Sequence, residues 1–442
     1  MAVARCFGVV ALALVAAGAA RAQTCPLTEA PQANDCHHLH LTMALSGQMV
    51  VQQEGKPVKL KLSATAEHRY RERVLAVHPY GAGIGKAARY YDDAHAAITV
   101  DGNASPRGLR PERRLTVAQR QTDTLLCYSP QGPLTREELE TVSEHFDTLA
   151  LAGLMPGKEV KVGETWQVSN PAAQALCQFE GLIANELTGK LTAVQGGTAT
   201  FTVEGTARGI ELGAQAKLTI TATGRYDVAS KHIVNLTWKQ KDERDQGPAS
   251  PAVHAETTVT VTRQMIEEPK ELSDVALVSV PQGYDVPDPL KLLTVPDGKG
   301  RFELACARDW QVVGQTDAHL VLRLLDRGDF VAQATVTPWQ KAEPGKHAEV
   351  KVFRDQMLSS PGWQPEEVMQ EGELPKQASG RFVYRVVARG EMDGVKVVQS
   401  FFLVAGPKGD QAVVAFTLKQ AQVAKLAVRD LLLVDGLDFP QK

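Results

Sequence analysis

Two histidines separated by one residue are the first candidates for chemistry in the chain. His38 and His40 lie in a segment, residues 38–45, in which apolar and polar residues alternate. In a β-strand, residues i and i+2 project from the same face, and two imidazoles on one face can ligate one metal ion such as zinc. No third ligand can be identified from the sequence. We therefore favour the alternative, in which both histidines lie on the solvated face of a hairpin.

A second cluster of metal-ligand residues consists of Asp92, Asp93 and His95. It lacks the glycines and the bidentate glutamate of a calcium-binding loop, so a solvated surface is again the favoured interpretation. The glycine-rich segment 81–86 has neither the length nor the hydroxyl residue of a phosphate-binding loop. No nucleophile elbow, zinc-protease motif or nucleotide fingerprint occurs. These observations argue against an enzyme, and we expect no cofactor.

The N-terminal residues 1–22 resemble a secretory signal peptide. One charge, Arg5, precedes an apolar run over residues 6–20, and Ala20-Arg21-Ala22 has the small residues of a cleavage site. The run is too short to span a bilayer comfortably, and no later segment approaches the necessary length. We therefore expect a periplasmic or extracellular protein that is soluble after cleavage near Ala22 and has no transmembrane segment.

Export would permit disulfides. Five cysteines follow the signal peptide, an odd number that leaves at least one thiol unpaired within the chain. We favour a bond between Cys25 and Cys36, which would hold the N-terminal segment, and consider a bond between Cys127 and Cys177 weaker. No cysteine spacing fits a zinc ribbon.

Composition limits the possible partners. The chain has 442 residues, 43% of them hydrophobic, which suits two or three domains with cores of their own. Its 48 basic and 51 acidic residues nearly cancel, so we expect no nucleic-acid partner. The arginines between residues 107 and 114 are interrupted by proline and glycine and favour a solvated loop.

Residues 23–266 are predicted to form a β-rich domain. Alternating apolar positions in residues 39–45 and 58–64 indicate a hairpin, and similar segments recur up to residue 263. One long helix is expected at about residues 136–152, with Thr135 and Glu138 as a capping box. Strands in series favour an antiparallel half-barrel or barrel whose concave side the helix fills.

This region weakly resembles uncharacterised secreted bacterial proteins whose β-meanders are similar to those of LolA-like lipoprotein carriers. The resemblance rests on the segment Gly163-Glu164-Thr165-Trp166 and on residues 224–227 leading into residues 233–238. It implies a curved sheet with an apolar hollow, and it assigns no functional residue.

Residues 267–300 contain five prolines. Proline removes a backbone donor and favours extended structure in the residue before it, so this stretch is predicted to be a connector. An ordered segment lying along one domain is an equal alternative, because residues 275–280 are apolar enough to pack.

Residues 301–442 are predicted to form a second domain, which makes the chain an α+β protein. Strands come first, then a helix at about residues 346–358, further strands, and a last helix at about residues 421–434. This order resembles the PsbP-like family of photosystem extrinsic proteins. The resemblance is carried by Asp309-Trp310, Met392-Asp393-Gly394, Phe401-Phe402-Leu403 and Leu437-Asp438-Phe439. It implies an α/β/α sandwich around an antiparallel sheet, in a module that binds or assembles rather than catalyses.

Three functional hypotheses follow. The first is an exported non-catalytic protein that binds an apolar small molecule or an envelope protein. The second is a secreted hydrolase or metal-dependent enzyme that uses the histidine and aspartate clusters. The third is a structural or adhesive surface component.

Overall fold

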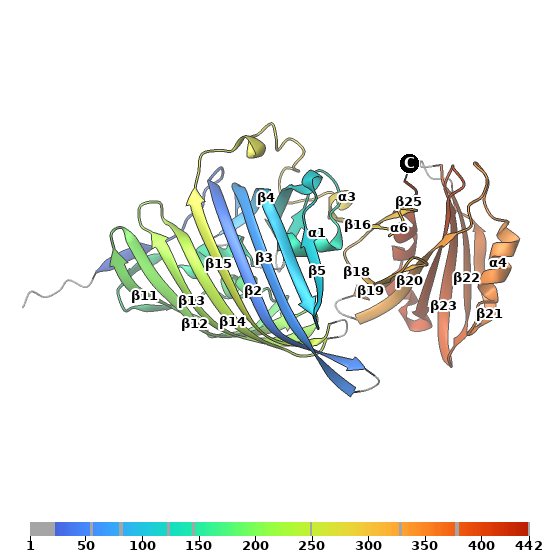
Figure 1. Cartoon of the computed structure of the whole chain (residues 1–442), viewed down its shortest axis with the longest axis horizontal. Coiled ribbons are helices and arrows are strands. Elements are labelled where there is room, and N and C mark those ends of the chain that lie inside the picture. The colour runs from blue at the N-terminus through green and yellow to red at the C-terminus, as the bar shows by residue number, and fades with distance from the viewer. Residues whose placement is uncertain are drawn as a thin grey trace, which may run out of the picture.

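The computed structural model describes residues 23–53, 56–78, 83–121, 124–143, 146–247, 250–326, 329–375 and 380–440. The predicted signal peptide and the start of the glycine-rich segment, residues 81 and 82, lie outside these ranges. The fold is mainly antiparallel β-structure arranged in two large sheets (Figure 1).

The larger sheet has thirteen strands. Its path is β7-β6-β4-β3-β2-β15-β14-β13-β12-β11-β9, with β5 beside β4 and β10 beside β12. The strands are β2 (Cys36–Gln53), β3 (Lys56–Val77), β4 (Ile84–Val100), β5 (Asn103–Gly108), β6 (Leu115–Arg120), β7 (Leu125–Tyr128), β9 (Thr165–Gln167), β10 (Gly181–Asn185), β11 (Thr188–Gln195), β12 (Thr198–Glu211), β13 (Ala214–Asp227), β14 (His232–Arg244) and β15 (Ala252–Met265). A separate pair joins β1 (Thr24–Leu27) to β8 (Lys158–Lys161).

Hydrophobic alternation gives this sheet a buried inner face and a solvated outer face. In β13 every second residue from Ala214 to Tyr226 is buried, and the residues between them are exposed. Three glycines on the inner face of this region lie under aromatic rings from neighbouring segments: Trp166 over Gly189, Phe179 over Gly209 and Phe201 over Gly224. The sheet curves strongly (Figure 1), and its path stays open, because the described residues of β7 and β9 do not pair with each other.

Helical segments fill part of the concave side. They are α1 (Arg136–Ser143), the 3-10 helix η2 (Thr148–Leu154) and α2 (Asn170–Leu176). The predicted capping box is present: the Glu138 backbone N–H donates to Thr135 Oγ1 at 3.1 Å, and the Thr135 backbone N–H donates to Glu138 Oε2 at 2.9 Å.

The single helix predicted at residues 136–152 is wrong in extent. Asp147 has extended backbone angles (φ −85°, ψ 91°), and its side chain accepts a hydrogen bond from the Leu149 N–H. An aspartate that caps a new helical turn in this way ends the previous one. Every residue of η2 is buried, so this segment is held by packing on all sides.

The proline-rich stretch is ordered and lies on the outer face of the first sheet. Leu272, Leu277, Val280 and Val286 form a small core with apolar residues of β3, β4, β6 and β7. The buried Lys86 ammonium donates hydrogen bonds to the Pro281 and Gly283 carbonyl oxygens, both at 2.7 Å. The stretch is therefore a packed strap, as in the second of the two predicted alternatives, and it includes η3 (Lys270–Leu272) and α3 (Asp288–Lys291).

The second large sheet has the order β18-β19-β20-β24-β23-β22-β21. Its strands are β18 (Trp310–Gln315), β19 (Leu320–Asp326), β20 (Asp329–Trp339), β21 (Trp363–Glu373), β22 (Phe382–Met392), β23 (Val395–Ala405) and β24 (Gln411–Lys419). A smaller sheet joins β16 (Leu293–Pro296), β17 (Glu303–Cys306) and β25 (Leu437–Asp438).

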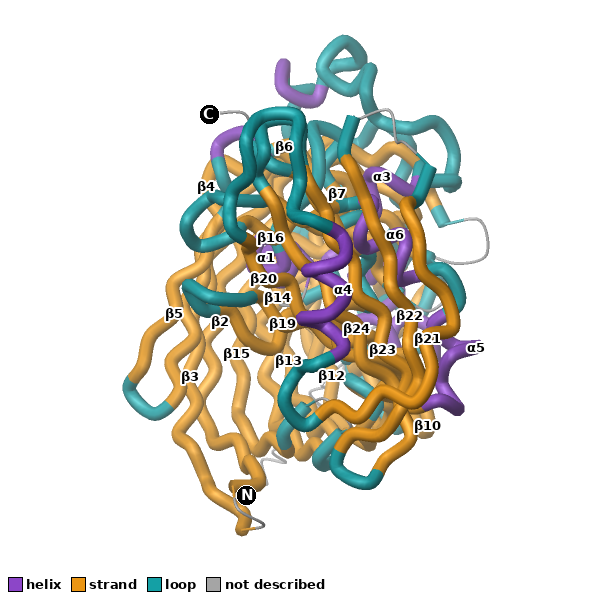
Figure 2. Tube along the Cα trace, turned by 90° about the vertical axis from the view of Figure 1, so that its right-hand side faces the viewer, coloured by secondary structure: helices purple, strands orange, loops and turns teal. Residues whose placement is uncertain are grey.

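Both faces of the second sheet carry helices. Phe353 of α4 (Val350–Leu358) packs with Val386, Phe401 and Leu403 on one face, and Figure 2 shows α4 crossing in front of this sheet. On the other face, Leu433 and Val434 of α6 (Arg429–Asp435) join the main core. The last helix is shorter than predicted, because η4 (Gln420–Gln422), α5 (Val423–Leu426) and α6 replace it and Ala427 has a positive φ of 50°.

Two arginines join the parts of the chain. Arg136 of α1 donates hydrogen bonds to the Arg308 and Trp310 carbonyl oxygens, and Arg308 donates to those of Lys291 and Cys127. Leu134 also forms a parallel bridge with Leu293. Among the described residues, no helix is long and apolar enough to cross a membrane.

Candidate functional site

The inner face of β2, β3 and β4 is apolar along most of its length. The strand register places Met43 opposite Ala66, and Leu45 opposite Ala64, which in turn faces Ile98 of β4. The residues between them, such as Ser46, Ser63 and Thr99, project from the outer face because side chains alternate along a strand. An apolar lane thus runs along the concave side of these three strands.

Other buried residues of the protein pack against only one end of this apolar lane. At the covered end, Leu39, Leu41 and Tyr70 are buried. Beyond the cover that α1 provides, Met43 and Leu45 remain partly exposed.

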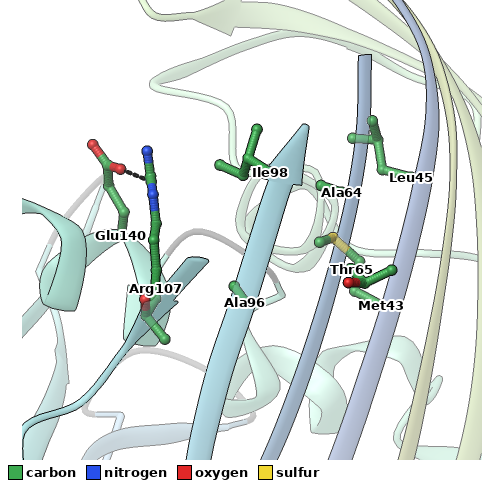
Figure 3. A pocket seen from close by; sticks show the side chains of 9 residues that line it. Met43, Leu45, Ala64, Thr65, Ala96, Ile98, Arg107 and Glu140 are labelled. Atoms are coloured by element: carbon green, nitrogen blue, oxygen red, sulfur yellow. Dashed lines mark hydrogen bonds and ion pairs between the residues drawn. The ribbon is translucent and has the colours of Figure 1, made fainter. Parts of the chain in front are cut away.

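A pocket of about 170 Å³ opens where the cover ends. Figure 3 shows its apolar wall on β2, β3 and β4 and the side chains of Arg107 and Glu140 next to it. Its lining residues are Met43, Leu45, Ala64, Thr65, Ala96, Ile98, Arg107, Glu140 and Thr141.

One ion pair supplies the charge at this pocket. Arg107 of β5 donates a hydrogen bond to Glu140 Oε2 of α1 (Figure 3). Their side chains are 21% and 23% exposed, so both reach solvent at the edge of the pocket. Apolar walls with one placed polar group are typical of sites for small molecules. The sequence had placed Arg107 in a solvated loop, because its partner lies 33 residues further along the chain.

A second polar group on the inner face is Asp242 of β14. Burial raises its pKa to about 6, while hydrogen bonds from Gln240 and Thr257 oppose the rise. Thr257 is the cross-strand neighbour of Leu45, so Asp242 lies near the apolar lane. We did not predict this residue. Its position in the sequence could have indicated it, because the alternation of β14 predicts an apolar residue at this inner-face position and an aspartate stands there.

One deeply buried ion pair holds elements of the first sheet together rather than facing a pocket. Arg89 and Glu72 form an ion pair at 2.8 Å and are 4% and 1% exposed at their side chains. Arg89 Nη2 also donates to Thr148 Oγ1, which lies 3.0 Å from the Tyr70 hydroxyl. Burial raises the pKa of Tyr70. This network attaches η2 to β3 and β4, and its burial closes it to a substrate.

The predicted metal ligands lie on the outer face. His40 Nε2 is 3.0 Å from Glu67 of β3, and His95 Nδ1 is 3.1 Å from Asp93. Since Glu67 is paired with His95 across the strands, the structure brings the two histidines to either side of β3. Asp92 instead pairs with Arg71.

These residues do not form a metal centre. Glu67 is also paired with Arg69, and His38 lies opposite Arg71 in the register. Within the described part of the chain, no group of three or more His, Cys, Asp or Glu residues could hold a metal ion. His40, His95 and Asp92 are instead paired with neighbouring charged side chains on the outer face.

The cysteines differ from the prediction. All five described cysteines are free thiols, and each is buried. Cys25 lies in β1 opposite Val160 of β8, whereas Cys36 begins β2 opposite Arg73, so the favoured pair belongs to two different ladders. Cys127 Sγ donates to the Val142 carbonyl oxygen at 3.9 Å. Neither the Cys25–Cys36 nor the Cys127–Cys177 bond is formed.

No family model and no curated protein sequence matches the chain. Solved structures show distant and partial similarity. A Bacteroides thetaiotaomicron protein aligns with 34% of this chain at a TM-score of 0.25 and 10% identity, and the chain spans about half of that protein (49%). The cyanobacterial PsbP protein of Synechocystis aligns with 36% of this chain and 99% of its own length at a TM-score of 0.25 and 14% identity. The Ran-binding protein Mog1p of Saccharomyces cerevisiae aligns with 34% of this chain and 95% of its own length at a TM-score of 0.25 and 16% identity. The chain thus has a distant, partial structural similarity to PsbP and Mog1p.

Proposed function

We propose that this protein is an exported, non-catalytic binding module that holds an apolar small molecule on the inner face of its first sheet. In this proposal the first sheet is a half-barrel with a partly filled hollow, and residues 301–442 form a PsbP-like α/β/α sandwich. The second part would support the first or contact an envelope protein.

The proposal rests on one observation: the apolar inner face of β2, β3 and β4 continues beyond the part that α1 covers. A sheet face that faced only water would carry polar residues, yet Met43, Leu45 and Ile98 continue the inner-face pattern past α1. Burying apolar surface stabilises a complex by roughly 25 cal/mol per Å². A ligand in the pocket beside α1 would therefore gain from contacts that the chain itself leaves unmade.

The shape of the site restricts the ligand. Pockets for drug-sized molecules enclose roughly 300–1,000 Å³, whereas this one measures about 170 Å³. A compact ligand would therefore not be enclosed. A narrow molecule with an apolar chain fits better, with the chain along β2 and β3 and a polar end near Arg107 and Glu140.

The proposal is tested by native mass spectrometry of the protein purified from its own cell envelope, with the same sample measured after denaturation. We expect an additional mass that is lost on denaturation. Ala64→Phe would place a ring in the pocket, because Ala64 lines it, and should abolish the additional mass.

Ser63→Phe is the matched control. Ser63 is exposed on the same strand and projects from the opposite face, so this variant should keep the additional mass. Absence of any additional mass in the native protein, or equal retention of that mass in both variants, would refute the pocket as the binding site.

A further inference from the structure

The hairpin formed by β2 and β3 extends beyond the sheet to which it belongs. The pairing of β15 with β2 ends at Ala252 and Val50, and the pairing of β4 with β3 ends at Val100 and Leu62. The two strands continue to pair with each other as far as Gln53 and Lys56. We call residues 51–53 and 56–61 the arm. Among the described residues, no further strand pairs with either edge of the arm, and Figure 1 shows the hairpin projecting below the sheet.

The arm combines partly exposed apolar residues with positive charge. Val51 faces Val58 across the hairpin, and both remain partly exposed, as does Leu60. Lys56, Lys59 and Lys61 are exposed. The described residues of the arm include no acidic side chain. In the sequence, three lysines and one glutamate, Glu54, give residues 51–61 a formal charge of +2.

A two-stranded hairpin has little stability of its own in water. Lysine and proline on its free edges, here Lys59, Lys61 and Pro57, disfavour pairing with another strand. The arm is therefore poorly suited to β-addition by a second protein. Apolar side chains together with lysines do match an anionic lipid surface, which offers both a hydrocarbon boundary and negative phosphates.

We propose that the arm docks the protein on an anionic lipid bilayer. The lysines contact lipid phosphates in the headgroup layer, and Val51, Val58 and Leu60 lie at the boundary with the acyl chains. The inner face of the arm leads through Leu62 to Ala64 at the pocket. This continuity, which rests on the proposed function, gives an apolar molecule a path between the bilayer and the pocket.

The test is cosedimentation of the purified protein with two kinds of vesicle. One contains phosphatidylglycerol and phosphatidylcholine, and the other contains phosphatidylcholine alone. We expect binding to the anionic vesicles that weakens as salt is added, because salt screens exposed charges. Lys59→Gln/Lys61→Gln should weaken this binding by about thirtyfold.

Lys190→Gln/Lys239→Gln is the matched control. Both lysines are exposed on the same sheet, on strands β11 and β14, and the control removes the same charge, so its binding should stay near that of the native protein. Val51→Ser/Val58→Ser should reduce the binding that persists at high salt.

Four results would overturn the proposal: no binding to anionic vesicles, equal binding to both vesicle types, equal weakening by the two lysine pairs, or self-association that the arm variants abolish. The last would assign the arm to a second copy of the chain. Ala64→Phe should bind vesicles normally. If this variant binds vesicles but also retains the small molecule, the pocket is refuted and the arm is left intact.

Discussion

On the inner face of the first sheet, two buried histidines lie beside an arginine and a glutamate that pair with each other. Arg263 donates to Glu29 at 2.5 Å and to the Ile233 carbonyl oxygen at 3.1 Å. His37 and His232 lie beside this pair with their ring centroids 5.7 Å apart. His37 Nδ1 and His232 Nε2 are buried without a hydrogen-bond partner. Such a pair of imidazoles resists protonation.

This arrangement predicts that the protein loses stability in mild acid. Burial, followed by the charges of Arg263 and His232, lowers the pKa of His37 to about 3, and Asp35 opposes the change. Below pH 6.5 the unfolded chain binds a proton at this residue and the folded chain does not. The free energy of unfolding should therefore fall with decreasing pH, by up to about 1.4 kcal/mol per pH unit, until the pH nears 3.

The measurement is denaturant unfolding at several values between pH 7.5 and pH 5, with His37→Phe as the comparison. The variant should lose most of the slope that His37 contributes. His232, whose pKa is also lowered mainly by burial, and Asp242, whose raised pKa acts in the opposite direction, are present in both proteins and cancel. Equal slopes would show that His37 does not titrate as described.

The sequence showed which side chains share a face of a strand, but it did not show which residues of neighbouring elements they contact. Alternation over residues 38–45 was enough to place His38 and His40 together on one face, because the period of a strand is two. It could not show that Glu67 of the next strand pairs with both His40 and Arg69, since cross-strand neighbours depend on register. Arg107 and Glu140 were missed for the same reason. Their contact exists only after β5 and α1 have packed.

At the scale of elements, polar residues at inner-face positions made the predicted strands shorter than the observed ones. β3 runs for 22 residues, yet only separate short segments of it were predicted. His68 and Glu72 occupy inner-face positions and interrupt the apolar alternation. The helix prediction failed at Asp147, which caps η2. In the sequence, an aspartate within a segment of helical apolar periodicity cannot be told from a solvent-exposed residue of one continuous helix. Local pattern identified the type of each element more accurately than its ends.

Glycines under aromatic rings predict how the curved sheet responds to added volume. A Cβ on Gly224 would lie 2.2 Å from the Phe201 ring, and Phe201 is fully buried. Gly224→Ala must therefore displace the ring within a packed core, and the free energy of unfolding should fall by about 1–3 kcal/mol. Denaturant unfolding measures the change.

Gly314→Ala supplies the control, because a Cβ there meets nothing within 4 Å. It should leave stability unchanged or slightly higher. Phe201→Leu in the Gly224→Ala background should recover part of the loss, since contacting residues couple energetically. If the effects of the two substitutions on the free energy of unfolding simply add, the Phe201 ring is not what the new Cβ displaces.

At the scale of the whole molecule, packed apolar residues as well as the chain itself join the two large sheets. The strap over residues 267–292 packs on the outer face of the first sheet. The main core continues from Leu134 to Leu293 and onward to Trp310 in the second sheet. Proline content predicted an extended connector, whereas the stretch contains η3, a series of turns and α3. Its apolar residues, which pack on the outer face of the first sheet, determine where it lies.

Arg136 and Arg308 are expected to couple the unfolding of the two sheets. Together they donate four hydrogen bonds to backbone carbonyl oxygens across the junction, and hydrogen bonds from charged groups contribute about 1.5–3 kcal/mol each. The native protein should show a single calorimetric transition. Arg136→Ala/Arg308→Ala should separate it into two, because each sheet keeps a core of its own while the junction loses its polar contacts.

The matched control is Arg354→Ala, which removes an arginine paired with Glu371 inside the second part alone. This pair is exposed and screened by solvent, so its loss should change stability little and leave one transition. Hydrogen exchange assigns the parts, since protection should be lost first on whichever side of the junction melts at the lower temperature. If the double variant still unfolds in one transition, the apolar contact between Leu134 and Leu293 is sufficient to make the molecule cooperative, and the arginines only orient it.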